Sequence, residues 1–141
     1  MEIVAMRIQA YLRVLGDEAT IRAIHRETKV SKASIKQLKA RKGMTRDDTW
    51  WNWQTARTPI DIENPDDGIR VLLSRYRPIF PLIRKHSGPD TDIYLEIVTQ
   101  YDENEDPHGL YLSAETVQLL SELGGALDND VVSLMDDPAE R

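Results

Sequence analysis

The stretch that decides the fold of this chain reads IYLEIVTQY (93–101), DENEDPHG (102–109), LSAETVQLLSEL (112–123) and GALDNDVVSL (125–134). Its first segment alternates apolar and polar side chains, which predicts a strand. Ser113 is a favourable N-cap for a helix whose inward face carries Val117, Leu120 and Leu123, and Gly124 is a favourable left-handed stop. Two valines in the last segment predict a short strand, so the predicted order is strand, helix, strand.

The first half of the chain begins with a second alternating pattern. From Val4 to Val14 every other residue is apolar, which predicts a strand. Asp17 can then cap a helix that runs to about Thr28. Further on, the aromatic segment WWNWQTA, which starts at Trp50, favours another strand.

The basic segment between these elements admits two interpretations. VSKASIKQLKARKG (30–43) can form a helix with Ile35 and Leu38 on one face, or an irregular connection followed by a strand. A later helix is better defined, because Asn64 is a plausible N-cap and a proline follows at the first helical position. Pro78 is expected to end or kink that helix.

These elements together predict an α+β fold with the ferredoxin-like order β-α-β-α-β-α-β. Strands with one apolar face, covered by helices, imply a two-layer sandwich with an antiparallel or mixed sheet and helices on one face. No repeat or flexible linker interrupts the pattern. We therefore expect residues 1–135 to form a single domain and residues 136–141 a disordered tail.

The composition is that of a soluble globular protein, since 40% of the 141 residues are hydrophobic and 30% are charged. No apolar run approaches the ~20 residues that span a bilayer, and we expect no cleaved signal at the start. The absence of cysteine excludes disulfides, thiolate zinc sites and thiol catalysis. A cytoplasmic protein that does not contact a membrane is therefore expected.

The net charge of −6 conceals an asymmetry along the chain. Residues 1–47 carry a net charge of +6 and residues 48–141 a net charge of −12, and nine basic residues lie between Arg22 and Arg46. Such segregation is typical of a nucleic-acid-binding surface. It is also expected where basic and acidic faces lie beside each other in one domain or across a dimer.

Five short features of the sequence occur in the same order in a known family. They are Arg41-Lys42-Gly43, the tryptophan strand at 50–53, a middle helix at 69–83, the strand at 93–101 and the ending LGGALDNDV at 123–131. Over nearly its whole length the chain resembles the bacterial domain of unknown function 4279. Asn129 stands where that family usually has an apolar residue, and the aromatic ending is absent. The resemblance implies a fold and no inherited active site.

Residues 20–42 also have the pattern of a helix-turn-helix, with TIRAIHRET (20–28) as the first helix and SKASIKQLKA (31–40) as the recognition helix. In that arrangement several side chains would contact phosphates or base edges: Lys32, Ser34, Lys36, Lys39, Arg41 and Lys42. Against it, His25 occupies a position that usually holds a small residue, and Lys29 replaces the turn glycine. The acidic remainder of the chain also opposes DNA binding.

The three tryptophans beside the basic segment are candidates for a stacking surface. Trp50 is expected to point away from Trp51 and Trp53, which makes it the candidate for an exposed contact. The other two are expected to pack into the core, because each buries a large apolar area.

The acidic loop has part of a calcium-binding pattern. Asp102, Asn104 and Asp106 have the spacing of the first ligands of an EF-hand. However, Pro107 replaces the required glycine and Ser113 the bidentate glutamate. We therefore interpret this segment as a solvated loop and expect no metal site.

Catalysis has little support in the sequence. There is no nucleophile elbow, P-loop or dinucleotide motif, and the three histidines lack a zinc spacing. Asp128 and Asp130 would share one face of a strand and could form a carboxylate pair for acid-base chemistry. Acids at the end of a strand are, however, usually surface residues.

We therefore predict a non-catalytic binding module without a cofactor, whose partner is another protein or a second copy of the chain. An immunity-type protein that neutralises a basic toxin is one concrete version. The alternative is a helix-turn-helix-like regulator that binds nucleic acid through residues 20–42. The candidate partner-binding residues are Lys32, Lys36, Lys39, Arg41, Lys42, Trp50, Asp102, Glu103 and Asp106.

Overall fold

A computed structural model of the chain describes residues 6–38, 50–101 and 109–133. Its elements are β1 (Arg7–Asp17), α1 (Glu18–Thr28), β2 (Ser34–Gln37), β3 (Trp50–Gln54), β4 (Thr58–Ile60), α2 (Pro65–Tyr76), the 3-10 turn η1 (Arg77–Ile79), α3 (Phe80–His86), β5 (Asp92–Tyr101), α4 (Ala114–Leu123) and β6 (Ala126–Ser133). Among these helices none has both the length and the apolar character needed to cross a membrane.

The described strands form one mixed sheet with β1 at its centre. β5 pairs antiparallel with β1 along one side, while β3 and β4 pair with successive parts of the other side. β2 lies beyond β3, and β6 lies parallel to β5 because α4 provides the crossover between them. The strand order is β2-β3-β1-β5-β6, with β4 beside β1. The predicted α+β class with a mixed sheet is confirmed. The ferredoxin-like order is not, because three strands lie between α1 and α2.

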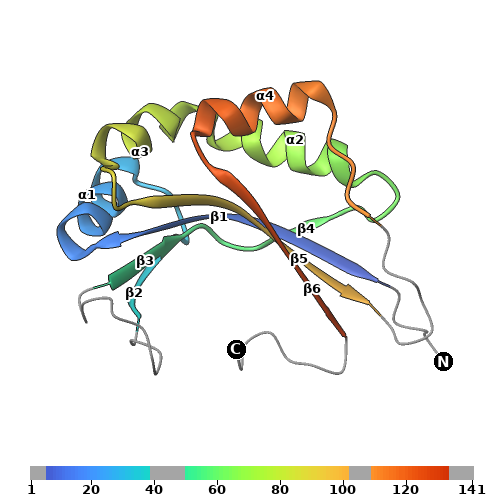
Figure 1. The fold of residues 1–141 in the computed structure, drawn as a ribbon, viewed down its shortest axis with the longest axis horizontal. Helices are drawn as coiled ribbons and strands as arrows, with labels where there is room; N and C mark the ends of the chain where they lie inside the picture. The colour runs from blue at the N-terminus through green and yellow to red at the C-terminus, as the bar shows by residue number, and fades with distance from the viewer. Residues whose placement is uncertain (1–5, 39–49, 102–108, 134–141) are drawn as a thin grey trace.

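The helices α1 to α4 all lie on one side of the sheet, as Figure 1 shows. The alternation along β1 explains how this layer attaches: Ala10, Leu12 and Val14 are fully buried in the core, whereas Tyr11 and Arg13 point to the opposite side. The side of the sheet that carries Tyr11 and Arg13 is called the helix-free face below.

The hydrophobic core fills the space between the helices and the sheet. Its fully buried members include Ile21 and Ile24 of α1, together with Ile69, Leu73, Ile83, Leu95, Ile97, Leu123 and Trp53. Full burial of each aliphatic side chain of this kind stabilises the fold by about 1.5–3 kcal/mol.

The predicted helix boundaries are confirmed by hydrogen bonds at the caps. Asp17 accepts from the Thr20 N–H at 2.8 Å, Asn64 caps α2, and Ser113 caps α4. Gly124 ends α4 with a left-handed φ of 75°. The helix that begins after Asn64 changes to a 3-10 turn at Pro78, as expected from a residue without a backbone N–H.

The ambiguous basic segment forms a strand at Ser34–Gln37. Lys29 and Lys32 adopt left-handed backbone angles, which end α1 and turn the chain back towards the sheet. Ile35 then lies opposite Trp53 of β3 and packs against the core. The predicted recognition helix is therefore wrong, because Ile35 gains its apolar contact by pairing in the sheet.

The inward face of α4 also differs from the prediction. Val117 is 50% exposed, whereas Thr116, Leu119 and Leu123 are buried. Thr116 faces the core because its hydroxyl lies 3.1 Å from the hydroxyl of Ser113, the residue that caps the helix. This hydrogen bond makes it possible to bury the polar side chain of Thr116. The apolar pattern predicts that Val117, and not Thr116, faces the core.

Candidate functional site

A row of polar side chains crosses the helix-free face from β3 to β6. Asn52 of β3, Arg13 of β1 and Glu96 of β5 point to this face, because each lies next to a core residue in its strand. Asp128 of β6 shares the face because it is the register partner of Glu96. Asn52 and Glu96 are buried although no described helix covers this side.

Arg13 connects three strands within this row. Its Nε donates to Asn52 Oδ1 at 2.7 Å, and its Nη1 lies 3.2 Å from Glu96 Oε1. Asn52 in turn donates to Gln54 Oε1 at 3.0 Å. The guanidinium is therefore held in one position, and one oxygen of Glu96 is satisfied.

Glu96 also has a like charge beside it. Glu96 and Asp128 are directly paired residues on parallel strands, and Glu96 is only 4% exposed. Its Oε2 is buried and has no hydrogen-bond donor in the structure. Burial, the contact with Asp128 and the Asp128 charge raise the pKa of Glu96 to about 7, although Arg13 opposes the shift. A proton on one carboxyl group would join the two residues, which we call the carboxylate pair.

A small apolar cluster lies beside Glu96. Tyr11, Val98 and Val132 form a buried cluster on the same face. The Arg57 guanidinium lies 5.1 Å from the centre of the Tyr11 ring. Burial raises the pKa of the Tyr11 hydroxyl, while the positive charge of Arg57 acts in the opposite direction. These neighbours reduce the access of water to Glu96 and strengthen the electrostatic interactions around it.

The two edges of the sheet carry opposite charges. At one edge, β2 and the turn before it expose Lys32 and Lys36. At the other edge, β6 carries Asp128 and Asp130 and has no lysine or arginine. The predicted asymmetry of charge along the chain thus becomes an asymmetry across the sheet.

Three of the predicted site residues lie in the described part of the chain: Lys32, Lys36 and Trp50. Lys32 and Lys36 are exposed at the β2 edge, whereas Trp50 is partly buried on β3. Six others lie outside the described residues: Lys39, Arg41, Lys42, Asp102, Glu103 and Asp106.

The remaining tryptophans are located largely as expected. Trp53 is fully buried, and Trp51 is partly buried and packs against the core. The Arg22 guanidinium lies 4.9 Å from the centre of the Trp51 ring. The described part of β3 thus uses its tryptophans mainly for packing.

Sequence reasoning missed Arg13, Asn52 and Glu96 as site residues. It identified Asp128 but paired it with Asp130 along the same strand, whereas the structure pairs it with Glu96 across two strands. One feature of the sequence could have indicated Glu96. It is an acidic residue within the alternating pattern of β5, and it points to the side of the strand that the buried apolar residues do not occupy. Its partner depends on the alignment of β5 with β6, which the sequence of either strand alone does not define.

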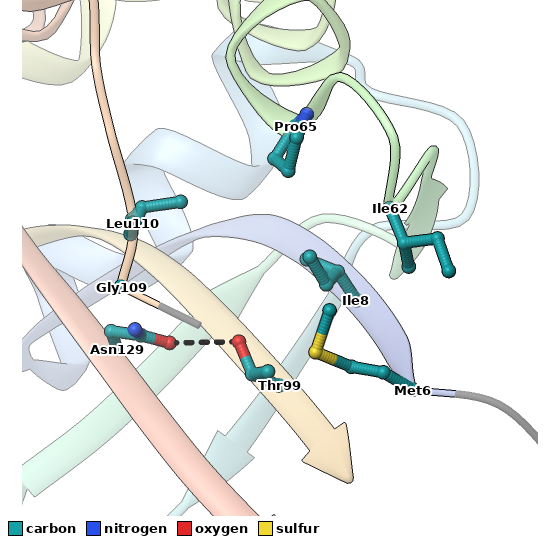
Figure 2. Close-up of a pocket in the computed structure, with 8 residues that line it drawn as sticks. All are labelled: Met6, Ile8, Ile62, Pro65, Thr99, Gly109, Leu110 and Asn129. Carbon is teal, nitrogen blue, oxygen red and sulfur yellow. Dashed lines mark hydrogen bonds between the residues drawn. The ribbon is translucent and has the colours of Figure 1, made fainter. Parts of the chain in front are cut away.

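A separate pocket of about 190 Å³ lies at one end of the sheet, between the β-layer and the start of α2. Its lining is mainly apolar, with Ile8, Ile62 and Leu110 on its walls, as Figure 2 shows. Thr99 donates a hydrogen bond to Asn129 Oδ1 at 3.1 Å along one side. This hydrogen bond gives a partner to the side-chain oxygen of Asn129, a polar residue at a position where the family usually has an apolar one.

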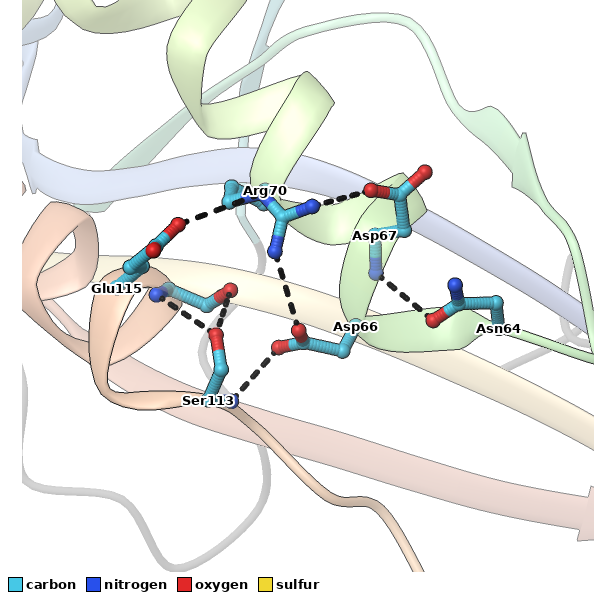
Figure 3. Close-up of polar contacts among 7 residues, drawn as sticks. Asn64, Asp66, Asp67, Arg70, Ser113 and Glu115 are labelled. Atoms are coloured by element: carbon cyan, nitrogen blue, oxygen red, sulfur yellow. Dashed lines mark hydrogen bonds and ion pairs between the residues drawn. The ribbon is translucent and has the colours of Figure 1, made fainter.

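A second polar cluster joins the first turns of α2 and α4 (Figure 3). Asp66 Oδ1 accepts a hydrogen bond from the Ser113 N–H at 2.8 Å, and Arg70 forms ion pairs with Asp66 and Asp67. Burial opposes ionisation of Asp66, but the hydrogen bonds from Ser113 and Thr116 outweigh it and lower the pKa of the carboxyl. These contacts satisfy helix ends, so we interpret this cluster as structural.

The fold and the site define an α+β protein whose helix-free face carries a carboxylate pair with one buried member, Glu96, and one exposed member, Asp128. The chain belongs to the family described as a domain of unknown function (DUF4279), whose model matches residues 6–134. No curated protein and no solved structure matches the chain. The resemblance seen in the sequence is therefore confirmed, and it brings no activity with it.

Proposed function

We propose that the chain is a non-catalytic binding module that recognises a basic protein partner through the acidic edge strand β6 and the adjoining carboxylate pair. The separation of opposite charges to the two edges of the sheet carries this proposal. Complementary charge accelerates association and selects against partners of the same sign.

The exposure of β6 supports its role as a contact surface. Leu127 and Val131 are exposed apolar residues on one side of the strand, and Asp128 is exposed on the other. As the last strand in the order of the described sheet, β6 has one side that no described strand pairs with. A partner can therefore combine backbone pairing with charge and apolar contacts at this edge.

The geometry favours a different protein over a second copy of the chain as the partner. A second copy would offer its basic β2 edge to the acidic β6 edge, which is a head-to-tail contact. Such a contact does not close into a dimer and would continue into a chain of molecules. A basic toxin that the module neutralises in the bacterial cytoplasm is the concrete version that we propose.

Charge reversal at β6 tests the proposal. Asp128→Lys is compared with Asp90→Lys, which makes the same charge change at an exposed residue outside β6. Proteins captured from the source cell by the wild-type chain are identified and purified, and their affinities are measured by calorimetry at several salt concentrations. We expect Asp128→Lys to weaken binding of a basic partner by at least about tenfold, and added salt to weaken wild-type binding.

Asp90→Lys is expected to bind the same partner nearly as well as the wild type. Equal affinities of the two variants would contradict the proposal, as would a captured partner whose affinity does not depend on salt.

The nucleic-acid alternative has less support. It relied on a recognition helix at residues 31–40, and residues 34–37 form the edge strand β2. Lys32 and Lys36 remain exposed and basic, but within residues 20–38 the structure does not present them on a helix that could enter a major groove.

A further inference from the structure

The carboxylate pair lacks one positive charge. Arg13 is the cation that contacts it in the described structure, and that guanidinium contacts Oε1 of Glu96, while Oε2 is buried without a donor. Two ionised carboxylates beside one guanidinium leave a net charge of −1. A buried acceptor without a donor is costly, so the site requires either a proton or a second cation.

The pair is accessible from one direction. Asp128 is exposed on β6, whereas Glu96 is buried behind it on β5. A cationic group from solvent therefore contacts Asp128 first, and contact with Glu96, whose Oε2 is buried, must come through the side of Asp128. The bond to Arg13, itself held by Asn52, keeps the Glu96 side chain in place for that contact.

We propose that Glu96 and Asp128 together bind one guanidinium or ammonium group of the partner, which supplies the second positive charge that the pair lacks. This inference rests on the proposed function, because it names the partner group that the acidic edge recognises. Where the pair holds a proton, that proton passes to solvent when the cation binds. Arginine fits best, since its planar fork can donate one N–H to each carboxylate.

The groups around Glu96 are consistent with this exchange. Arg13 and Tyr11 face it from β1 and Asp128 faces it from β6, while Asp130 and Arg57 act on the Tyr11 hydroxyl. The raised pKa of Glu96 means that the proton is released near neutral pH, where displacing it by a cation costs little.

A model compound tests the site without knowledge of the partner. The side-chain carboxyl signal of Glu96 is followed by carbon NMR across the pH range in the full chain, with N-acetylarginine amide as the probe. N-acetylcitrulline amide is the matched control, because it has nearly the same shape and no charge. Both titrations are run at the same ionic strength.

We expect the arginine probe to lower the titration midpoint of Glu96 by about 1 pH unit at saturation. The citrulline probe should leave the midpoint unchanged. Asp128→Asn, which changes an exposed residue, should abolish the effect of the arginine probe.

Three outcomes would overturn the inference: no shift with the arginine probe, an equal shift with the citrulline probe, or an undiminished shift in Asp128→Asn. The capture experiment does not depend on the arginine probe. The proposed function and the cation site can therefore be contradicted independently of each other. Loss of partner binding in Asp128→Lys with an unresponsive Glu96 would remove only this inference. A responsive Glu96 with unaltered partner binding would remove only the proposed function.

Discussion

Glu96 makes the stability of the protein depend on pH. Its pKa is raised from 4.5 to about 7 in the folded chain, so between these values the folded state binds more protons than the unfolded state. The free energy of unfolding must then fall as pH rises from about 4.5 to 7 and become level above that. We expect a decrease of about 3 kcal/mol from this residue, measured by urea unfolding at a series of pH values.

Replacement of Glu96 by Gln should remove most of this dependence, because the amide does not titrate. Glu115→Gln is the control, since the Glu115 side chain is 81% exposed and should retain the wild-type slope. An unchanged slope in Glu96→Gln would show that other groups dominate.

Position 124 requires glycine because of its backbone conformation and not because of crowding by its neighbours. Its φ is 75°, while an added Cβ would meet only the flexible Arg84 side chain at 3.8 Å. Gly124→Ala should therefore lower the free energy of unfolding by about 1 kcal/mol, as measured by urea titration. Gly88→Ala is the control, because an added Cβ meets nothing within 4 Å and its φ is not positive. Equal effects of the two changes would contradict this argument.

At the scale of elements, a hydrogen bond to Asp66 connects the start of α4 with the start of α2. The Asp66 carboxylate accepts from the Ser113 N–H, a donor that helix α4 cannot satisfy internally. Asp66→Ala should lower the free energy of unfolding by about 1–3 kcal/mol at neutral pH. The pKa of Asp66 is lowered on folding, so this stabilisation is present above pH 3.8 and is lost as pH falls below it.

Asp67→Ala is the comparison for this prediction, since Asp67 pairs with Arg70 at the surface and does not contact Ser113. Its replacement should cost less than about 1 kcal/mol in urea unfolding. A larger loss in Asp67→Ala than in Asp66→Ala would mean that the ion pair with Arg70 matters more than the bond between the helices.

Elements with strong local signals were predictable from the sequence. Alternation defines β1 and β5, and the caps at Asp17, Asn64 and Ser113 define three helix starts, because these signals act within a few residues. β2 was not predictable, since VSKASIKQLKA contains too few apolar residues to separate a strand from a helix. Its conformation depends on pairing with Trp53, which lies 18 residues after Ile35.

At the scale of the whole molecule, the distribution of charge argues against binding to duplex DNA. The net charge is −6, and the described residues of the basic β2 edge form a strand instead of a helix that could enter a groove. We expect no binding of a labelled duplex at physiological salt, measured by fluorescence anisotropy. Steep, salt-dependent binding that Lys36→Glu abolishes would reverse this conclusion and support the nucleic-acid alternative.

The sequence by itself determined the α+β class, most helix and strand positions, the family and the separation of positive from negative charge. These properties depend on local patterns and on composition. Only the tertiary structure decided that Glu96 pairs with Asp128, that Arg13 reaches Asn52, and that the charges lie at opposite edges of the sheet. The physical reason is that strand order and alignment arise from the packing of distant segments, which no single segment encodes.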